Sequence, residues 1–267
     1  MRGAGRMTVA VVAALVVSLA MVASAQRRRF FYGWDETVRN APYDGRFTFA
    51  RVRYTPAPGG NWAGGRPSWV HGYPLAEMNL LQIMKEVSLL DAQTDAMNVV
   101  TLDDPALFTY PIAYIIEVGW WTMSDREVAG LRAYLQKGGF LIVDDFKVAG
   151  WRGLPGGGWQ PFAENVKRVL PGAQFFDMSP SDPIFHSFFE VTPQTLDDFP
   201  QAYTYGKAVF RGVYEDNDPK KRLLMIVNYN TDVSQYWEWS GRGLRPFDDT
   251  NEAYKLGVNY LIYGLTH

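Results

Sequence analysis

Short apolar runs dominate the chain after residue 46. Residues 47–54 alternate apolar and polar side chains, which predicts a strand with one buried face. The runs at 112–118 and 140–143 are almost entirely apolar, which is typical of a parallel strand covered on both faces. The remaining predicted strands span 97–102, 174–178, 208–214 and 223–229.

Segments with helical periodicity separate these strands. Residues 75–90 place apolar side chains on one broad face, and Ser124 with Glu127 has the signature of a capping box for a helix that ends at Gly138-Gly139. Further helices are expected at 162–169 and 251–265. Alternation of strands and helices predicts an α/β fold with a mostly parallel sheet and helices on both faces.

The first 25 residues have the pattern of a cleavable secretory signal peptide. Arg2 and Arg6 precede the apolar run Val9–Val22, and Ala23-Ser24-Ala25 has the small-x-small form of a cleavage site. That run is shorter than the roughly 20 residues that span a bilayer. We therefore predict a periplasmic or secreted protein.

An N-terminal membrane anchor is the alternative. Arg27–Arg29 follow the cleavage site at once, and positive charge there opposes translocation. In either case residues 26–46 are polar and irregular and are interpreted as an arm, and residues 47–267 as a single α/β domain.

Composition removes several classes of function. Without residues 1–25 the chain has 24 basic and 28 acidic residues, a net charge of −4, which disfavours a nucleic-acid partner. The chain contains no cysteine, which excludes disulfides, thiolate metal sites and a cysteine nucleophile. It also lacks the G-x-S-x-G and H-E-x-x-H motifs of two large hydrolase classes.

Candidate binding residues follow from the predicted sheet, because ligands of α/β proteins bind at the carboxyl ends of the strands. Polar and aromatic side chains gather at or just after those ends and in one later turn. The candidate ligand-binding residues are Glu117, Trp120, Trp121, Asp144, Asp145, His186 and Asn228.

One interpretation of these residues is a metal or acid–base site built from Asp144, Asp145 and His186, with Glu117. Oxygen ligands suit a hard cation, but neighbours on a strand point to opposite faces, so at most one of the two aspartates would reach a given ligand. The alternative is that the aspartates cap the next loop and His186 bonds its own turn. We therefore predict no metal ion and no cofactor.

A second interpretation is a cleft for a sugar or another stacking ligand. Exposed tryptophan is unfavourable, so several of them in loops need an explanation. The alternative is that the rings pack on one another and hold the long loops in place. The tryptophans in predicted loops are Trp62, Trp69, Trp120, Trp121, Trp151 and Trp159.

Three blocks in order resemble a bacterial family catalogued as domain of unknown function 4159. They are Phe47–Tyr54, the run from Leu131 to Asp145 with Gly138-Gly139 and Asp144-Asp145, and Asp182–Phe188. The resemblance extends over about residues 46–265 and implies a flavodoxin-like sheet similar to class I glutamine amidotransferases, with no established activity. The cysteine nucleophile of those enzymes is absent here, and Phe146-Lys147 stands where many family members have cysteine.

The resemblance also implies partners. Some members of the family are membrane-anchored and associated with von Willebrand-type and AAA-type proteins, which would suit a scaffold in an envelope complex. We predict a non-catalytic domain that binds a glycan, a small ligand or an envelope protein, in a cleft lined by Trp120, Asp144, Asp145 and His186. The alternatives are a metal- or carboxylate-dependent hydrolase acting on a carbohydrate-like substrate, and a protein-interaction scaffold.

Overall fold

The computed structural model describes residues 40–62, 65–146, 158–202 and 206–267. The predicted signal peptide at 1–25 and most of the predicted arm lie outside the described residues, as do Trp151 and most of the glycine-rich loop. Among the described helices, none has both the length and the apolar character needed to cross a membrane.

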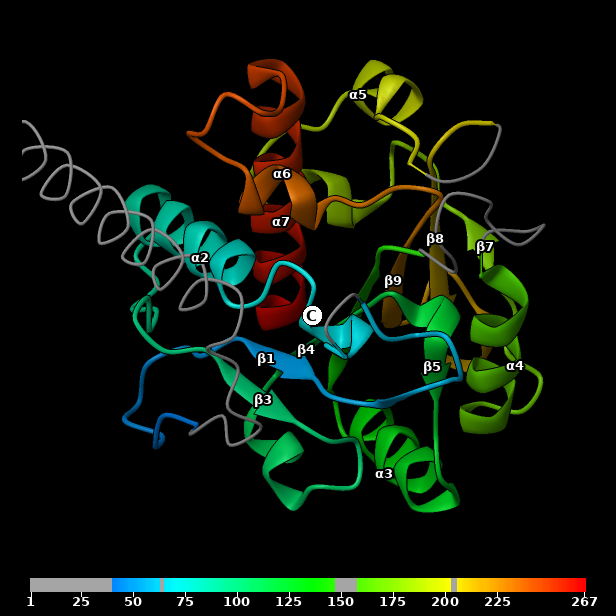
Figure 1. Cartoon of the computed structure of the whole chain (residues 1–267). Helices are drawn as coiled ribbons and strands as arrows, with labels where there is room; N and C mark the ends of the chain where they lie inside the picture. Colours follow the sequence, from blue (N-terminus) through cyan, green and yellow to red (C-terminus); the bar gives the residue numbers. More distant parts are fainter. Residues whose placement is uncertain (1–39, 63–64, 147–157, 203–205) are drawn as a thin grey trace, which may run out of the picture. The chain divides into compact units, whose positions relative to one another are not determined.

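A seven-stranded sheet forms the centre of the described part of the chain (Figure 1). Five neighbouring strands are parallel, and the last two are antiparallel to the strand beside them. This confirms the predicted α/β fold with a mostly parallel sheet. In order across the sheet, the strands are β3 (Asn98–Val100), β1 (Ala50–Val52), β4 (Ile112–Ile116), β6 (Phe140–Asp144), β9 (Leu223–Tyr229), β8 (Val209–Tyr214) and β7 (Phe176–Asp177).

Helices cover both faces of the sheet (Figure 1). One group is α2 (Leu75–Val87), α6 (Ser234–Glu238) and α7 (Phe247–Thr266), which contact one another. The other group is α3 (Asp125–Gln136) and α4 (Trp159–Val169). A short helix, α5 (Pro193–Asp198), lies outside these groups, and β2 (Thr55–Pro56) pairs with β5 (Trp121–Thr122) in a separate antiparallel ribbon.

Close contacts fix the helices on the sheet. Gly264 of α7 lies so near Ile112 and Phe140 that an added Cβ would be 2.7 Å from the Phe140 ring. The capping box of α3 is present, because the Ser124 side chain accepts from the Glu127 amide while Glu127 accepts from the Ser124 amide. The strand and helix predictions are therefore confirmed at the level of whole elements.

The boundaries differ from the prediction in ways that packing explains. The strand predicted over 47–54 is regular only at Ala50–Val52, and Phe47 forms an isolated bridge to Ala92. The helix predicted over 75–90 ends at Val87, because Ser88 adopts an extended conformation and its hydroxyl donates to the Met84 carbonyl. The short helices α5 and α6 were not predicted, since five or six residues carry too little periodicity.

Candidate functional site

Three strands of the sheet end in the same unusual way. The residue after β4 is Glu117, the residue after β6 is Asp145 and the residue after β9 is Asn230, with φ angles of 47°, 52° and 58°. Residues other than glycine rarely adopt this left-handed backbone conformation, and strained residues concentrate at functional sites. In this protein the left-handed residues turn the chain at the carboxyl edge of the sheet, where a ligand of an α/β fold is expected.

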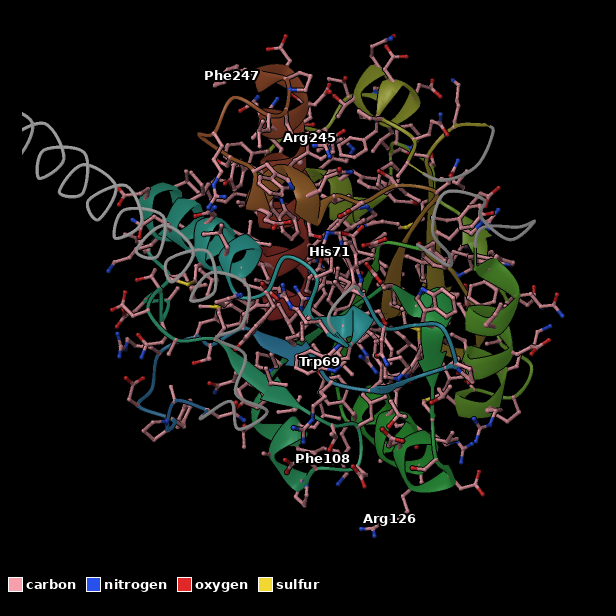
Figure 2. All side chains as sticks on the ribbon, in the orientation of Figure 1. Trp69, His71, Phe108, Arg126, Arg245 and Phe247 are labelled. Carbon is pink, nitrogen blue, oxygen red and sulfur yellow. The ribbon has the colours of Figure 1, made fainter. Side chains whose placement is uncertain are left out.

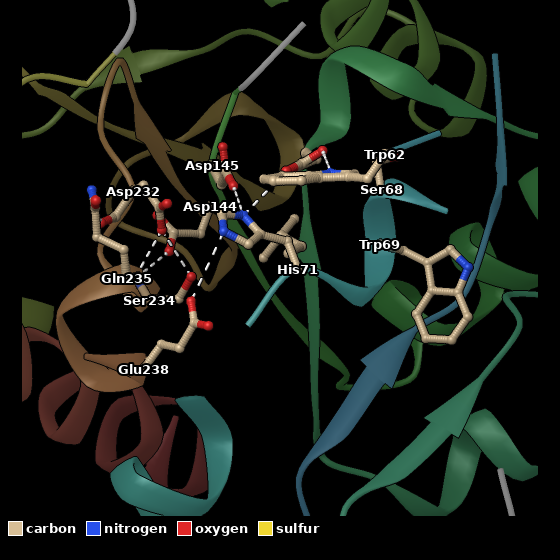
Figure 3. A network of polar contacts seen from close by, with 12 residues as sticks. Trp62, Ser68, Trp69, His71, Asp144, Asp145, Asp232, Ser234, Gln235 and Glu238 are labelled. Atoms are coloured by element: carbon tan, nitrogen blue, oxygen red, sulfur yellow. Dashed lines mark hydrogen bonds and ion pairs between the residues drawn. The ribbon is translucent and has the colours of Figure 1, made fainter. Parts of the chain in front are cut away.

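His71 lies beside two of these residues, Asp145 and Glu117, and Figure 3 shows it next to Asp145. The Asn230 side chain instead donates to the carbonyls of Gly206 and Lys207. The Nδ1 of His71 is 2.8 Å from Asp145 Oδ2 and 3.1 Å from Glu117 Oε1. Its Nε2 is 3.9 Å from Oε2 of Glu238, which ends α6. Figure 2 shows His71 inside the array of side chains, whereas Arg126 and Phe247 lie at its periphery.

Asp232 completes the group from the segment between β9 and α6. Its Oδ1 accepts from the Ser234 hydroxyl and the Gln235 amide, each at 2.9 Å, and so caps the start of α6. One donor atom each from His71, Asp145 and Asp232 lies within 4.8 Å of the other two. We refer to His71, Glu117, Asp145, Asp232 and Glu238 as the His71 cluster.

The His71 cluster is mostly buried. Glu117, Asp145 and Asp232 are at most 2% exposed, whereas the side chains of His71 and Glu238 are 21% and 18% exposed. Solvent therefore reaches the cluster beside His71 and Glu238.

Burial and like charge change the protonation of this cluster. Burial, with the charge of Asp145, raises the pKa of Asp232 to about 8 and that of Glu117 to about 6. Burial alone lowers the pKa of His71, but its hydrogen bonds to Asp145 and Glu117 outweigh burial and raise that pKa well above its ordinary value. Four carboxyl groups thus surround a single imidazole.

A buried ion pair holds the segment that carries His71. Arg51 of β1 donates from Nε to Glu77 at 2.6 Å, and from Nη1 to the carbonyls of Trp69 at 2.9 Å and His71 at 3.1 Å. Arg51 and Glu77 are both fully buried. Breaking this pair would leave an uncompensated buried charge, so the Arg51 guanidinium is held in place. Its bonds to the two carbonyls therefore fix the His71 backbone relative to the sheet.

Asp144 holds the segment on the other side of the site. Its carboxylate accepts from Tyr114 Oη at 2.9 Å, Asn228 Nδ2 at 3.2 Å, and the amides of Val233 at 3.1 Å and Ser234 at 2.9 Å. Burial raises the pKa of Asp144 to about 6, and the backbone donors oppose this shift. Asp144 therefore anchors the backbone next to Asp232.

The structure separates the predicted site residues into groups. It brings Glu117 and Asp145 together at His71, and it places Asp144 and Asn228 beneath the site, where Asn228 donates to Asp144 and accepts from Tyr260. As expected for strand neighbours, only one of the two adjacent aspartates reaches His71.

His186 lies elsewhere. Its Nδ1 contacts Glu190 at 2.6 Å and its Nε2 contacts the Pro180 carbonyl at 2.7 Å, on an exposed turn. The prediction that His186 converges with Asp144 and Asp145 is therefore wrong. The alternative, in which this histidine bonds its own turn, agrees with the structure.

The predicted tryptophans have different surroundings. Trp121 is buried against Phe162, Trp69 packs on Tyr73, and Trp159 packs within a larger aromatic group. Trp120 lies against Gly60, where an added Cβ would be 2.8 Å from Trp120 Cβ. Trp62 is the exception, because its ring lies beside His71 with 4.7 Å between ring centroids.

Three members of the His71 cluster were not among the predicted residues. Asp232 comes three residues after the end of β9, so the strand-end rule used for the other candidates also applies to it. His71 and Glu238 carry no such signal, because the long loop before α2 and the short helix α6 bring them to the sheet edge.

The chain was compared with known proteins at the level of families and of single proteins. No curated protein gave a significant match. Residues 48–265 match the profile of a family described as Domain of unknown function (DUF4159), over most of the chain and nearly all of its described part. The chain belongs to this family of domains of unknown function, DUF4159.

Proposed function

We propose that the His71 cluster binds a divalent cation and that the domain is a ligand-binding part of an exported envelope protein. The observation that carries this proposal is the convergence of one imidazole nitrogen and two carboxylate oxygens, from His71, Asp145 and Asp232, within 4.8 Å. These atoms come from three separate segments at one edge of the sheet, as expected of a site that the fold assembles.

The charge of the cluster supports a cation. Buried carboxylates are strongly unfavourable unless a positive charge or a proton offsets them. Glu117, Asp145 and Asp232 are almost fully buried, with Glu238 beside them, and His71 is the one basic side chain in the cluster. Bound protons offset the negative charge of these carboxyl groups when no cation is bound, and a divalent cation displaces those protons.

The donor set narrows the choice of cation. Imidazole suits zinc, nickel and related transition metals, carboxylates suit manganese, magnesium and calcium, and a chain without cysteine offers no thiolate. A mixed set of one imidazole and at least two carboxylates therefore favours Mn²⁺, Zn²⁺ or Ni²⁺ over Mg²⁺ and Ca²⁺. Glu117 and Glu238 are near enough to His71 to serve as further ligands.

The finer fold class and the location of the protein belong to the same proposal. The parallel strands follow the order β3-β1-β4-β6-β9, which is the 2-1-3-4-5 order of flavodoxin-like sheets and supports the flavodoxin-like, amidotransferase-like interpretation. In such sheets ligands bind at the carboxyl ends of the strands, which is the edge where Glu117, Asp145 and Asp232 lie. The signal-peptide pattern of residues 1–25 supports export.

Calorimetric titration of the chelator-treated protein tests the cation site. We expect one equivalent of Mn²⁺, Zn²⁺ or Ni²⁺ to bind, and D145N and D232N each to weaken binding by at least about a hundredfold. His186→Ala is the matched control, because it removes a histidine that also contacts a glutamate. Absence of stoichiometric binding for all these ions, or equal loss in the His186 variant, would overturn the proposal.

A carbohydrate hydrolase is the second candidate, supported by the pairing of Glu117 with Asp145. Their oxygens lie 3.1 Å and 2.8 Å from the same nitrogen of His71. These two oxygens are therefore no more than about 6 Å apart, which is compatible with the roughly 5–5.5 Å between the paired carboxyl groups of retaining glycosidases. Release of new reducing ends from an oligosaccharide, lost in E117Q and retained in the His186 variant, would favour this candidate.

A further inference from the structure

We propose that the cation-loaded His71 cluster binds a neutral saccharide, with the indole of Trp62 as the stacking surface. This inference rests on the proposed cation site and adds the class of ligand that the site receives. It draws on Trp62, which no step of the cation argument used.

Trp62 is attached to the cluster by two contacts. Its ring lies against the His71 imidazole, with centroids 4.7 Å apart and planes tilted by 42°. Its Nε1 donates to Glu117 Oε2 at 3.0 Å (Figure 3). Trp62 is nevertheless 37% exposed, so an aromatic surface accessible to solvent lies directly beside the buried carboxylates.

Backbone hydrogen bonds between described residues hold Trp62 in place. The Trp62 amide donates to the Arg66 carbonyl at 2.7 Å, and the Ser68 amide donates to the Gly60 carbonyl at 3.0 Å. Gly60 in turn packs directly on Trp120. A ligand that stacks on Trp62 therefore meets an indole whose own backbone amide is already hydrogen-bonded, which favours affinity.

The charge of the site selects against anions. Three buried carboxyl groups, those of Glu117, Asp145 and Asp232, lie beside the proposed cation, so phosphates, nucleotides and acidic sugars would meet repulsion there. A neutral pyranose avoids this repulsion. Its hydroxyls bind a cation or donate to carboxylates, and its flat C–H face packs on an indole.

A single ligand can reach both Trp62 and the partly exposed side of the His71 cluster. His71 lies between Trp62 and Glu238, and the side chains of His71 and Glu238 are the partly exposed members of the cluster (Figure 3). A sugar ring on Trp62 would therefore direct hydroxyls toward the same opening through which solvent reaches the cluster.

The test is a titration of the full chain, first saturated with the cation that binds it, with three neutral oligosaccharides: cellotetraose, tetra-N-acetylchitotetraose and maltotetraose. We expect at least one of them to bind, chelation to abolish that binding, and Trp62→Ala to weaken it at least about tenfold. Trp62→Phe retains a ring and should retain most of the affinity. Phe247→Ala is the matched control, because it removes an aromatic side chain that is 82% exposed at the start of α7.

The outcomes separate the two proposals. Cation binding without binding of any of the three sugars overturns the saccharide inference and leaves the cation site standing, and failure to bind a cation overturns the cation site. Equal sugar binding by the Trp62→Ala protein also overturns the inference. Binding of tetramethylammonium to the chelator-treated protein, with no binding of the sugars, would also overturn the inference. It would identify an organic cation as the ligand instead.

Discussion

Replacing Asp232 with asparagine separates the stability of the fold from its proposed ligand. Asp232 Oδ1 accepts from the Ser234 hydroxyl and the Gln235 amide, and the amide oxygen of asparagine can accept from both. The substitution therefore keeps the cap of α6 while it removes one negative charge beside Asp145. We expect the variant to be more stable than the wild type without a cation, and to bind a cation at least about a hundredfold more weakly.

The pKa of Asp232 sets the size of this effect. Burial and the charge of Asp145 raise it from 3.8 to about 8, so between these values the folded protein binds more protons than the unfolded chain and its stability falls as pH rises. Four pKa units correspond to about 6 kcal/mol as an upper bound. Because the charges of Asp145 and His71 also act on Asp232, we expect one substitution to recover about 1–3 kcal/mol at pH 8.

Urea unfolding in the presence of a chelator measures this difference. The free energy of unfolding of D232N should exceed that of the wild type at pH 8, and the gain should shrink toward zero as pH falls to about 4. Asp95→Asn is the control, because Asp95 is an exposed aspartate outside the His71 cluster. A D232N protein less stable than the wild type at both pH 5 and pH 8 would show that protonated His71 already balances the cluster, and would refute the reasoning.

Three further predictions concern other parts of the chain. Asp144→Asn leaves buried donors without an acceptor, since one amide oxygen replaces a carboxylate that accepts four bonds, and should lower the free energy of unfolding in urea by about 2–4 kcal/mol. Gly130→Ala places a Cβ 2.0 Å from the Leu102 carbonyl oxygen and should destabilise the protein by about 1–3 kcal/mol in the same assay. N-terminal sequencing of the exported protein should find Gln26 first, and a start at Met1 would indicate an anchor.

The sheet was predictable because its strands are buried on both faces. The residues of β4 and β6 are all buried, and this leaves a continuous apolar run in the sequence that does not depend on knowing their partners. The antiparallel edge is less regular. β7 contains two residues, Phe176 and Asp177, and neither is fully buried, so little of its pattern distinguishes it from a loop.

The site was only half predictable for a similar reason. Glu117 and Asp145 directly follow apolar strands, so their place at the sheet edge follows from the strand pattern. His71 reaches the same place because Arg51 binds the carbonyls of Trp69 and His71. A contact between a strand residue and a loop about twenty positions later leaves no local pattern in the sequence.

The two groups of buried charge in this domain differ in a way that argues for a ligand. Arg51 and Glu77 are fully buried and meet one to one, which is how folded proteins ordinarily bury charge. In the His71 cluster, by contrast, several carboxyl groups share one imidazole, although the same fold forms a matched pair on β1 and α2. An excess of negative charge that lowers stability is retained most readily when binding of a cation offsets it. Comparing the free energy of unfolding of D232N and the wild type, with and without a cation, therefore tests the proposed cation site as well as the stability of the fold.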